Sequence, residues 1–157
     1  MALAGIYSNM SYSSASRNLN PTGNAKSLQS TYINGTIGTL SAGTIVSVDS
    51  AGQILPVDIT QDVSVDAIVG VVMIDSLTGA STQVIDVGRI LNFTTAYIVG
   101  TALFIDPTGA LTDVKPADGV GGFHVGMNCI FVGVIVQNES NPSLKDLKVL
   151  INKVGKL

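Results

Sequence analysis

The chain has 157 residues, which fits one domain with a substantial hydrophobic core, and it carries a formal net charge of −3. Only 12% of the residues are Asp, Glu, Lys or Arg, against roughly 25% in an average soluble domain, and the mean hydropathy is +0.46. This is too little charge to cover a free monomer, so we expect an oligomer, and the single cysteine excludes both an internal disulfide and a multi-thiolate metal site.

Residues 1–30 are expected to form an extended N-terminal arm. Ser11–Asn24 is rich in Ser, Asn and other small residues, and neither a helical nor a strand period holds there. Tyrosines and a methionine among small residues are typical of interface anchors, and a frayed terminus is the alternative interpretation. The arm residues that we expect to contact a partner surface are Tyr7, Met10, Tyr12, Arg17 and Leu19.

Residues 31–157 are expected to form one all-β domain. Runs of strand length, rich in apolar and β-branched residues, recur with Gly, Pro, Asp or Ser between them, which is the pattern of a β-barrel or β-sandwich. Ala67–Ile74 is apolar throughout, which predicts a strand covered on both faces. Short helical turns are expected only at Asn24–Gln29 and Ser143–Lys148. The expected strands are Thr31–Ile37, Thr44–Val48, Gln53–Asp58, Ala67–Ile74, Thr82–Val87, Leu91–Tyr97, Ala102–Asp106, Leu111–Val114, Phe123–Met127, Cys129–Val136 and Leu147–Val154.

The chain also repeats itself, because each half contains a hairpin, a Val-Gly-Val strand and a closing strand. The matched segments are Gly43–Val57 with Gly100–Val114, Val69–Val72 with Val132–Ile135, and Val87-Gly88 with Val154-Gly155. Two units are too few for a solenoid, which needs about three. We therefore expect an internally duplicated barrel or sandwich; a chance match in a chain rich in Gly, Val and Thr is the alternative.

The two hairpins share a turn whose residues have a geometric role. Asp49 and Asp106 begin the turns, where an aspartate accepts hydrogen bonds from its own backbone two residues on. Gly52 and Gly109 supply a positive φ, and Pro107 has the φ of the first inner turn position. These residues are explained by turn geometry and not by chemistry.

No catalytic set is expected. His124 is the only histidine, Cys129 lies in an apolar strand as a buried small residue, and no nucleophile elbow or phosphate-binding loop is present. Asp58, Asp62 and Asp66 lie four residues apart, which indicates a solvated turn, with a calcium site as the alternative because calcium prefers oxygen ligands. The sequence therefore predicts no cofactor and no enzymatic activity.

Nucleic acid and membranes are not expected partners. The pI is about 4.7, and neither a basic stripe nor an aromatic platform is present. The longest apolar runs have eight residues, far short of the ~20 that span a bilayer. The C-terminal lysines, Lys145, Lys148, Lys153 and Lys156, are expected to solubilise an edge strand. Most acidic residues lie between mildly basic ends, a pattern that can guide self-association or docking.

A progression of short motifs resembles a known family. The segments Gly43–Asp49, Ala67–Val71, Val84–Gly88, Gly100–Asp106 and Val132–Val136 follow one another in the order found in the capsid decoration (cement) proteins of tailed bacteriophages. The resemblance covers roughly residues 43–154. This chain departs from the pattern in having a Phe, at position 104, where a Tyr is common, and in an N-terminal arm that the motifs do not match.

The resemblance implies a structural virion protein. It implies a homotrimer that binds the major capsid protein on the outer surface of the capsid shell, after synthesis in the host cytoplasm, and stabilises the shell. The arm would then make the shell contacts. A head-fibre base or tail adaptor is the alternative within the virion, and a carbohydrate-binding β-module is the alternative outside it, although such modules usually present exposed aromatic residues and this chain has no Trp.

Overall fold

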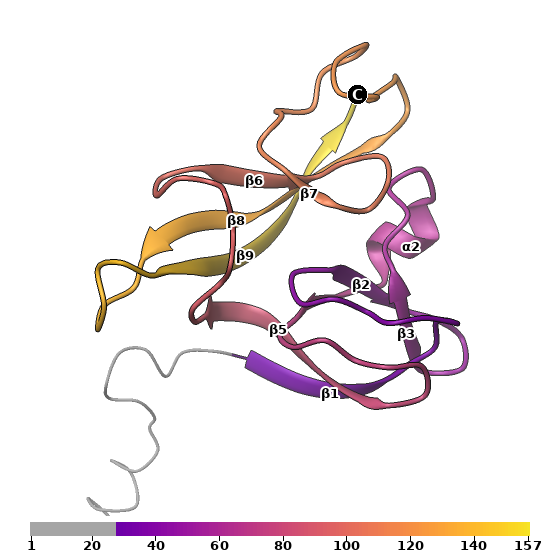
Figure 1. Cartoon of the computed structure of the whole chain (residues 1–157). Coiled ribbons are helices and arrows are strands. Elements are labelled where there is room, and N and C mark those ends of the chain that lie inside the picture. The colour runs from indigo at the N-terminus through magenta and orange to yellow at the C-terminus, as the bar shows by residue number, and fades with distance from the viewer. Residues whose placement is uncertain (1–27) are drawn as a thin grey trace, which may run out of the picture.

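The computed structural model describes residues 28–157, which form an almost entirely β structure with a closed five-stranded barrel and additional strands (Figure 1). The predicted all-β fold class is thereby confirmed. The elements are β1 (Leu28–Asn34), β2 (Ile45–Val48), β3 (Gln53–Pro56), α2 (Asp62–Asp66), β4 (Ile68–Val72), β5 (Ser81–Ile90), β6 (Ala102–Ile105), β7 (Leu111–Thr112), β8 (Asn128–Gln137) and β9 (Lys145–Lys156).

The strands form one sheet in the order β1-β3-β2-β4-β5-β9-β8-β6-β7, and a further pairing of β1 with β5 closes the first five into a barrel. β1 is parallel to β3 and antiparallel to β5. It begins at Leu28, so three residues that the sequence analysis placed in the arm belong to a barrel strand. Figure 1 shows β6, β8 and β9 extending away from the barrel strands, with β5 as the junction.

The two halves of the chain have the same strand pairing. β2 pairs with β3 and β4, and β4 pairs with β5; likewise β6 pairs with β7 and β8, and β8 pairs with β9. The registers coincide as well, because Val46 opposite Gly70 is equivalent to Leu103 opposite Gly133. The predicted duplication is therefore a duplication of structure, and the two units meet where β5 pairs with β9.

The third sequence match, between Val87-Gly88 and Val154-Gly155, does not follow the structural equivalence of the two units. Val72 pairs with Val84 in the first unit, and Ile135 pairs with Leu147 in the second. Counting on from these pairs, Val87 corresponds to Leu150, and not to Val154. The echo between Val87-Gly88 and Val154-Gly155 is therefore a similarity of sequence without equivalent position.

The two hairpin turns are built identically. The Oδ1 atom of Asp49 accepts hydrogen bonds from the backbone N–H of Ala51 and Gln53, at 2.8 and 2.9 Å. The Oδ1 atom of Asp106 accepts the equivalent bonds from Thr108 and Ala110, at 2.8 and 3.0 Å. The glycines at positions 52 and 109 have φ values of 78° and 87°, as the turn requires. The predicted turn roles of these residues are confirmed.

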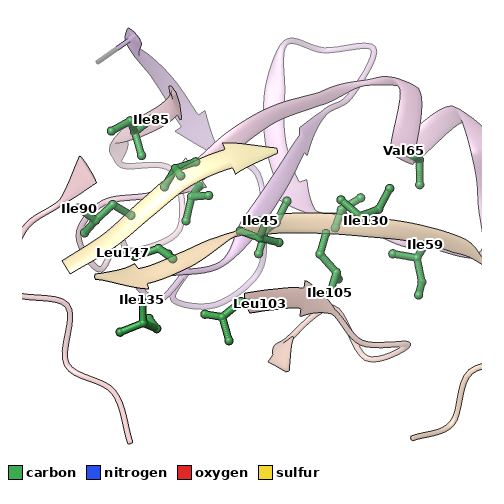
Figure 2. Close-up of a cluster of buried hydrophobic side chains, with 14 of the residues drawn as sticks. Ile45, Ile59, Val65, Ile85, Ile90, Leu103, Ile105, Ile130, Ile135 and Leu147 are labelled. Carbon is green, nitrogen blue, oxygen red and sulfur yellow. The ribbon is translucent and has the colours of Figure 1, made fainter. Parts of the chain in front are cut away.

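The hydrophobic side chains form two cores. The smaller core fills the barrel and consists of Leu40, Val46, Ile54, Val72 and Val84. The larger core lies between the outer face of the barrel and the sheet of the second unit, and Figure 2 shows side chains of both units gathered in it. β2 therefore has core on both faces, since Ile45 belongs to the larger core and Val46 to the smaller one. The same holds for β4, as the apolar run predicts.

Four expected elements differ from the structure. Leu28 and Gln29, the end of the helical turn expected at Asn24–Gln29, belong to β1, and the rest of that segment lies outside the described residues. β5 ends at Ile90, because Asn92 adopts a φ of 54° that a strand cannot continue through, so Leu91–Tyr97 is a loop and not a strand. Phe123–Met127 is also a loop, and Phe123 is fully buried there as a core anchor. Ser143–Lys148 is not helical, because pairing with β8 extends β9 back to its first residue, Lys145.

The structure also contains a helix that the sequence analysis missed. α2 is a single short turn before β4, and its Val65 is buried in the larger core. The Ser64 hydroxyl bonds the Ser47 hydroxyl of β2, at 3.0 Å, and accepts the backbone N–H of Asp58, at 2.9 Å. These contacts hold the turn against the barrel, although five residues are too few for a recognisable amphipathic pattern.

Candidate interaction surface

A row of large apolar side chains crosses five neighbouring strands on the open face of the sheet. In β1, β5 and β9 the row follows the strand pairing, with Leu28 opposite Val87 and Val87 opposite Leu150. On β8, Phe131 stands opposite Asn152 of β9 and pairs with Phe104 of β6, so two aromatic residues extend the row beyond a polar position of β9. We call these five residues the apolar stripe. Leu28 is 65% exposed and Leu150 is 53% exposed, which is high for large aliphatic side chains.

The stripe lies on the side of the sheet that faces away from the larger core. Ile130, Val132 and Ile135 of β8 point into the core, whereas Phe131 and Val134 point to the other face. Successive side chains of β8 do not alternate strictly between the two faces. The cause is a register shift between β6 and β8, where one extra residue of β8 stands opposite β6. The face is therefore one continuous surface despite the bulge.

The two aromatic residues of the stripe pack against each other. The ring centroids of Phe104 and Phe131 lie 5.8 Å apart, with an angle of 70° between the ring planes, which is the favoured edge-to-face arrangement. Both side chains remain half-buried. The pair gives the open face of the second unit a rigid apolar centre.

On β2 the equivalent face of the first unit is buried, whereas Val87 of β5, the equivalent of Leu150, is 37% exposed. The residues equivalent to Ala102 and Phe104 are Ile45 and Ser47, with exposed fractions of 0% and 6%. Ile45 is covered because the second unit packs its core-facing side against this outer face of the barrel, and Ser47 contacts α2 through the Ser64 hydroxyl. Over β2 and β6, the two copies of the structural unit thus differ in their cover: the outer face of β2 is buried, and that of β6 is partly exposed to solvent.

A polar cluster borders the stripe at the ends of β5, β8 and β9. The buried Asp146 accepts the backbone N–H of Asn92 at 3.0 Å and the side-chain amide of Asn138 at 2.8 Å, and its second oxygen lies 3.5 Å from Nε of Arg89. Arg89 also pairs with the exposed Glu139. These contacts fix the Asn92 turn and leave the cluster engaged within the chain.

Two of the three spaced aspartates pair with lysines of β9. Asp62 lies 2.7 Å from Nζ of Lys156, and Asp66 lies 3.0 Å from Nζ of Lys153. Asp58 instead accepts the backbone and hydroxyl of its neighbour, Thr60, which lowers its pKa. The three carboxylates therefore do not converge, and no group of three metal-ligating side chains lies within residues 28–157.

The lysines of β9 do not all lie on an edge strand as expected. Over Leu147–Leu150 the strand is central, because it pairs with both β5 and β8. Nζ of Lys145 donates to the carbonyl of Tyr97 at 2.6 Å, which ties the loop after β5 to β9. At least three of the four lysines therefore make specific contacts within the chain.

The hydrogen bond to Lys156 predicts a pH response of Asp62. This bond, followed by the one from the Asn128 amide, holds the pKa of Asp62 below its ordinary value of 3.8. The ion pair is thus present above that value and is lost as the pH falls through the lowered pKa of the folded state. An NMR titration should show the pKa of Asp62 rising toward 3.8 in Lys156→Gln and staying unchanged in Lys148→Gln. An unchanged pKa in both variants would contradict the assignment.

The remaining candidate residues carry no assembled chemistry. His124 is exposed on the loop before β8, and burial raises the pKa of the Cys129 thiol, which is 8% exposed. Two open recesses of about 380 and 390 Å³ lie on either side of Leu91, and both are lined by Met73 and Ile90. The recess that Gln29 and Ile74 also line has a mostly apolar wall, and the one that Asp75 and Asn92 also line has a mostly polar wall.

The residues that the sequence analysis expected to contact a partner, Tyr7, Met10, Tyr12, Arg17 and Leu19, lie outside the described residues. The stripe was not foreseen. A signal for it exists in the aligned repeats, because Phe104 stands where the first unit has Ser47. A small polar residue replaced by a phenylalanine marks the face whose surroundings differ between the units.

Two further findings concern membrane-spanning helices and similarity to known proteins. In residues 28–157 no helix is long and apolar enough to cross a membrane. No protein-family model and no curated protein sequence matches the chain.

Proposed function

We propose that the protein is a structural virion component that decorates the outer surface of a bacteriophage capsid shell as a homo-oligomer. The observation that carries the proposal is the apolar stripe, an open sheet face with five large apolar side chains in a chain with only 12% charged residues. Large apolar patches of this kind mark sites of protein–protein contact. The motif progression that resembles capsid decoration proteins indicates the kind of assembly.

The mechanism of such a protein is added contact between shell subunits. A β fold with two packed cores presents fixed surfaces, so little conformational freedom is lost when they dock. Weak individual contacts gain strength when several copies joined in one oligomer bind neighbouring shell subunits at the same time. No catalytic group is required for this function, and we assign none.

The proposal assigns the contact with the major capsid protein to the N-terminal arm, through Tyr7, Met10, Tyr12, Arg17 and Leu19. The arm holds two basic residues and no acidic one, which suits an acidic partner surface. Because β1 begins at Leu28, a deletion of residues 1–24 removes these five residues and leaves the barrel strand in place.

The test is co-sedimentation of the purified protein with capsid shells that lack it. We expect saturable binding in many copies per shell and a higher disruption temperature of the decorated shells, and loss of both after deletion of residues 1–24. An Ile37→Ser variant, altered at an exposed loop residue, is the control and should bind normally. Binding of a dozen copies or fewer would favour a tail adaptor or head-fibre base, and absence of binding would reject the proposal.

A further inference from the structure

The duplication itself shows what kind of surface fits the apolar stripe. In the first unit, Ile45, Val71 and Ile85 on the outer face of the barrel are covered by another sheet, the core-facing side of the second unit. Sheets that pack face to face in this way interdigitate their side chains at about 10 Å separation. The open face of the second unit has the same strand pattern, and so it can accept a sheet of similar shape.

The chain has no remaining sheet within residues 28–157 to cover this face. The core-facing side of the second unit is used against the barrel, and the inner face of the first unit is closed inside it. The extended apolar sheet face that is left is the stripe itself. A second copy of the chain supplies one more such face, with the same twist and the same row of apolar residues.

The size of the face is sufficient for self-association. Five strands at a spacing of about 4.8 Å give a width of roughly 24 Å. β8 and β9 have 10 and 12 residues, and a ten-residue strand is about 33 Å long. β5 also has 10 residues, but β1 has seven and β6 four, so the five strands together cover roughly 680 Å² of sheet, which approaches the roughly 800 Å² per partner of a standard protein–protein interface.

The residue types along the face also suit an interface between copies. The Phe104–Phe131 pair lies on β8 and β6, and aromatic residues are enriched in protein interfaces. The exposed Lys148 of the middle strand β9 stands where the first unit has the fully buried Ile85. The face therefore keeps contact with water at this position of β9.

We infer that copies of this chain associate through the apolar stripe, with the stripes of neighbouring copies facing one another about a symmetry axis. The stripe of one copy then covers the stripe of its neighbour, as the second unit covers the outer face of the first unit within one chain. The inference rests on the proposed function for the need for an oligomer, but its test uses the protein alone. A protein that self-associates and fails to bind shells would reject the proposed function and leave this inference standing.

The experiment measures the mass of the full chain in solution by light scattering and native mass spectrometry. Leu150→Glu and Leu28→Glu each place a charge in the stripe at a position that is more than half exposed in the single chain, so both variants should fold. Ile37→Glu introduces the same charge on the loop after β1, outside the stripe, and is the matched control. The wild type and the control should be oligomers, and both stripe variants should weaken association at least about tenfold with unchanged circular dichroism.

Three results would overturn the inference. A wild-type protein that stays monomeric across the accessible concentrations would show that the stripe has another occupant or none. Persistence of the oligomer in both stripe variants would place the contact elsewhere. Loss of the oligomer on deletion of residues 1–24, with the stripe variants unaffected, would assign association to the arm.

Discussion

Gly133→Ala should lower the free energy of unfolding by about 3 kcal/mol or more. A Cβ atom at this position would lie 2.0 Å from the backbone carbonyl oxygen of Lys148, so β8 and β9 must separate to admit it. At the equivalent position of the first unit, a Cβ on Gly70 would lie 2.4 Å from the carbonyl oxygen of Ile85, and its φ of 142° adds strain. Gly70→Ala should therefore be destabilising to a similar degree.

The matched control for these glycines is Gly38→Ala. No atom lies within 4 Å of the added Cβ there, and the backbone is not in the left-handed region, so stability should change by less than about 0.5 kcal/mol. Thermal unfolding should separate the variants by roughly 6 to 12 °C for a domain of this size. Equal midpoints for Gly133→Ala and Gly38→Ala would contradict the close approach of β8 and β9.

Asp146→Ala should cost about 3 kcal/mol, the second large effect that we expect. The buried carboxylate accepts hydrogen bonds from Asn92 and Asn138 and faces Nε of Arg89. Its removal leaves these donors without an acceptor in a water-poor site, and such unsatisfied groups are costly. Chemical denaturation with urea measures the loss.

Glu139→Ala is the control for Asp146, because both carboxylates contact the same arginine. The Glu139 side chain is 70% exposed, and an exposed ion pair contributes about 0 to 1 kcal/mol. Asp146→Asn retains the shape and the oxygen acceptor but removes the charge, so it should be less damaging than Asp146→Ala. Equal losses of stability in Glu139→Ala and Asp146→Ala would contradict the larger contribution that we assign to the buried carboxylate.

Much of the fold was predictable because its strongest signals are local. The Asp and Gly residues of the two hairpin turns determine where β2 and β3, and β6 and β7, reverse direction. The loop after β5 was not predictable, since its residues 91–97 are strand-like in composition and the strand ends through the φ of Asn92. That conformation depends on Asp146, which is 54 residues away along the chain.

The candidate surface was less predictable than the fold, for a physical reason. Phe104 and Phe131 read as core residues in the sequence, and in an average domain they would be. Their exposure follows from how the two units pack. The second unit covers the outer face of the barrel, and no segment within residues 28–157 covers the outer face of the second unit. A periodic pattern indicates which residues share a face of a strand, but it does not indicate which face remains open.

The end of the sheet at β7 has a consequence for how copies of this protein add to one another. In the first unit β1 covers the edge of β3, whereas the equivalent strand β7 has only two residues, Leu111 and Thr112, and no described strand beyond it. A long open edge would permit chain after chain to add by backbone hydrogen bonds and to polymerise without limit. An edge of two residues offers too short a template, so chains cannot add at this end of the sheet by backbone hydrogen bonds, and association there is left to side-chain contacts, which can close into a finite particle.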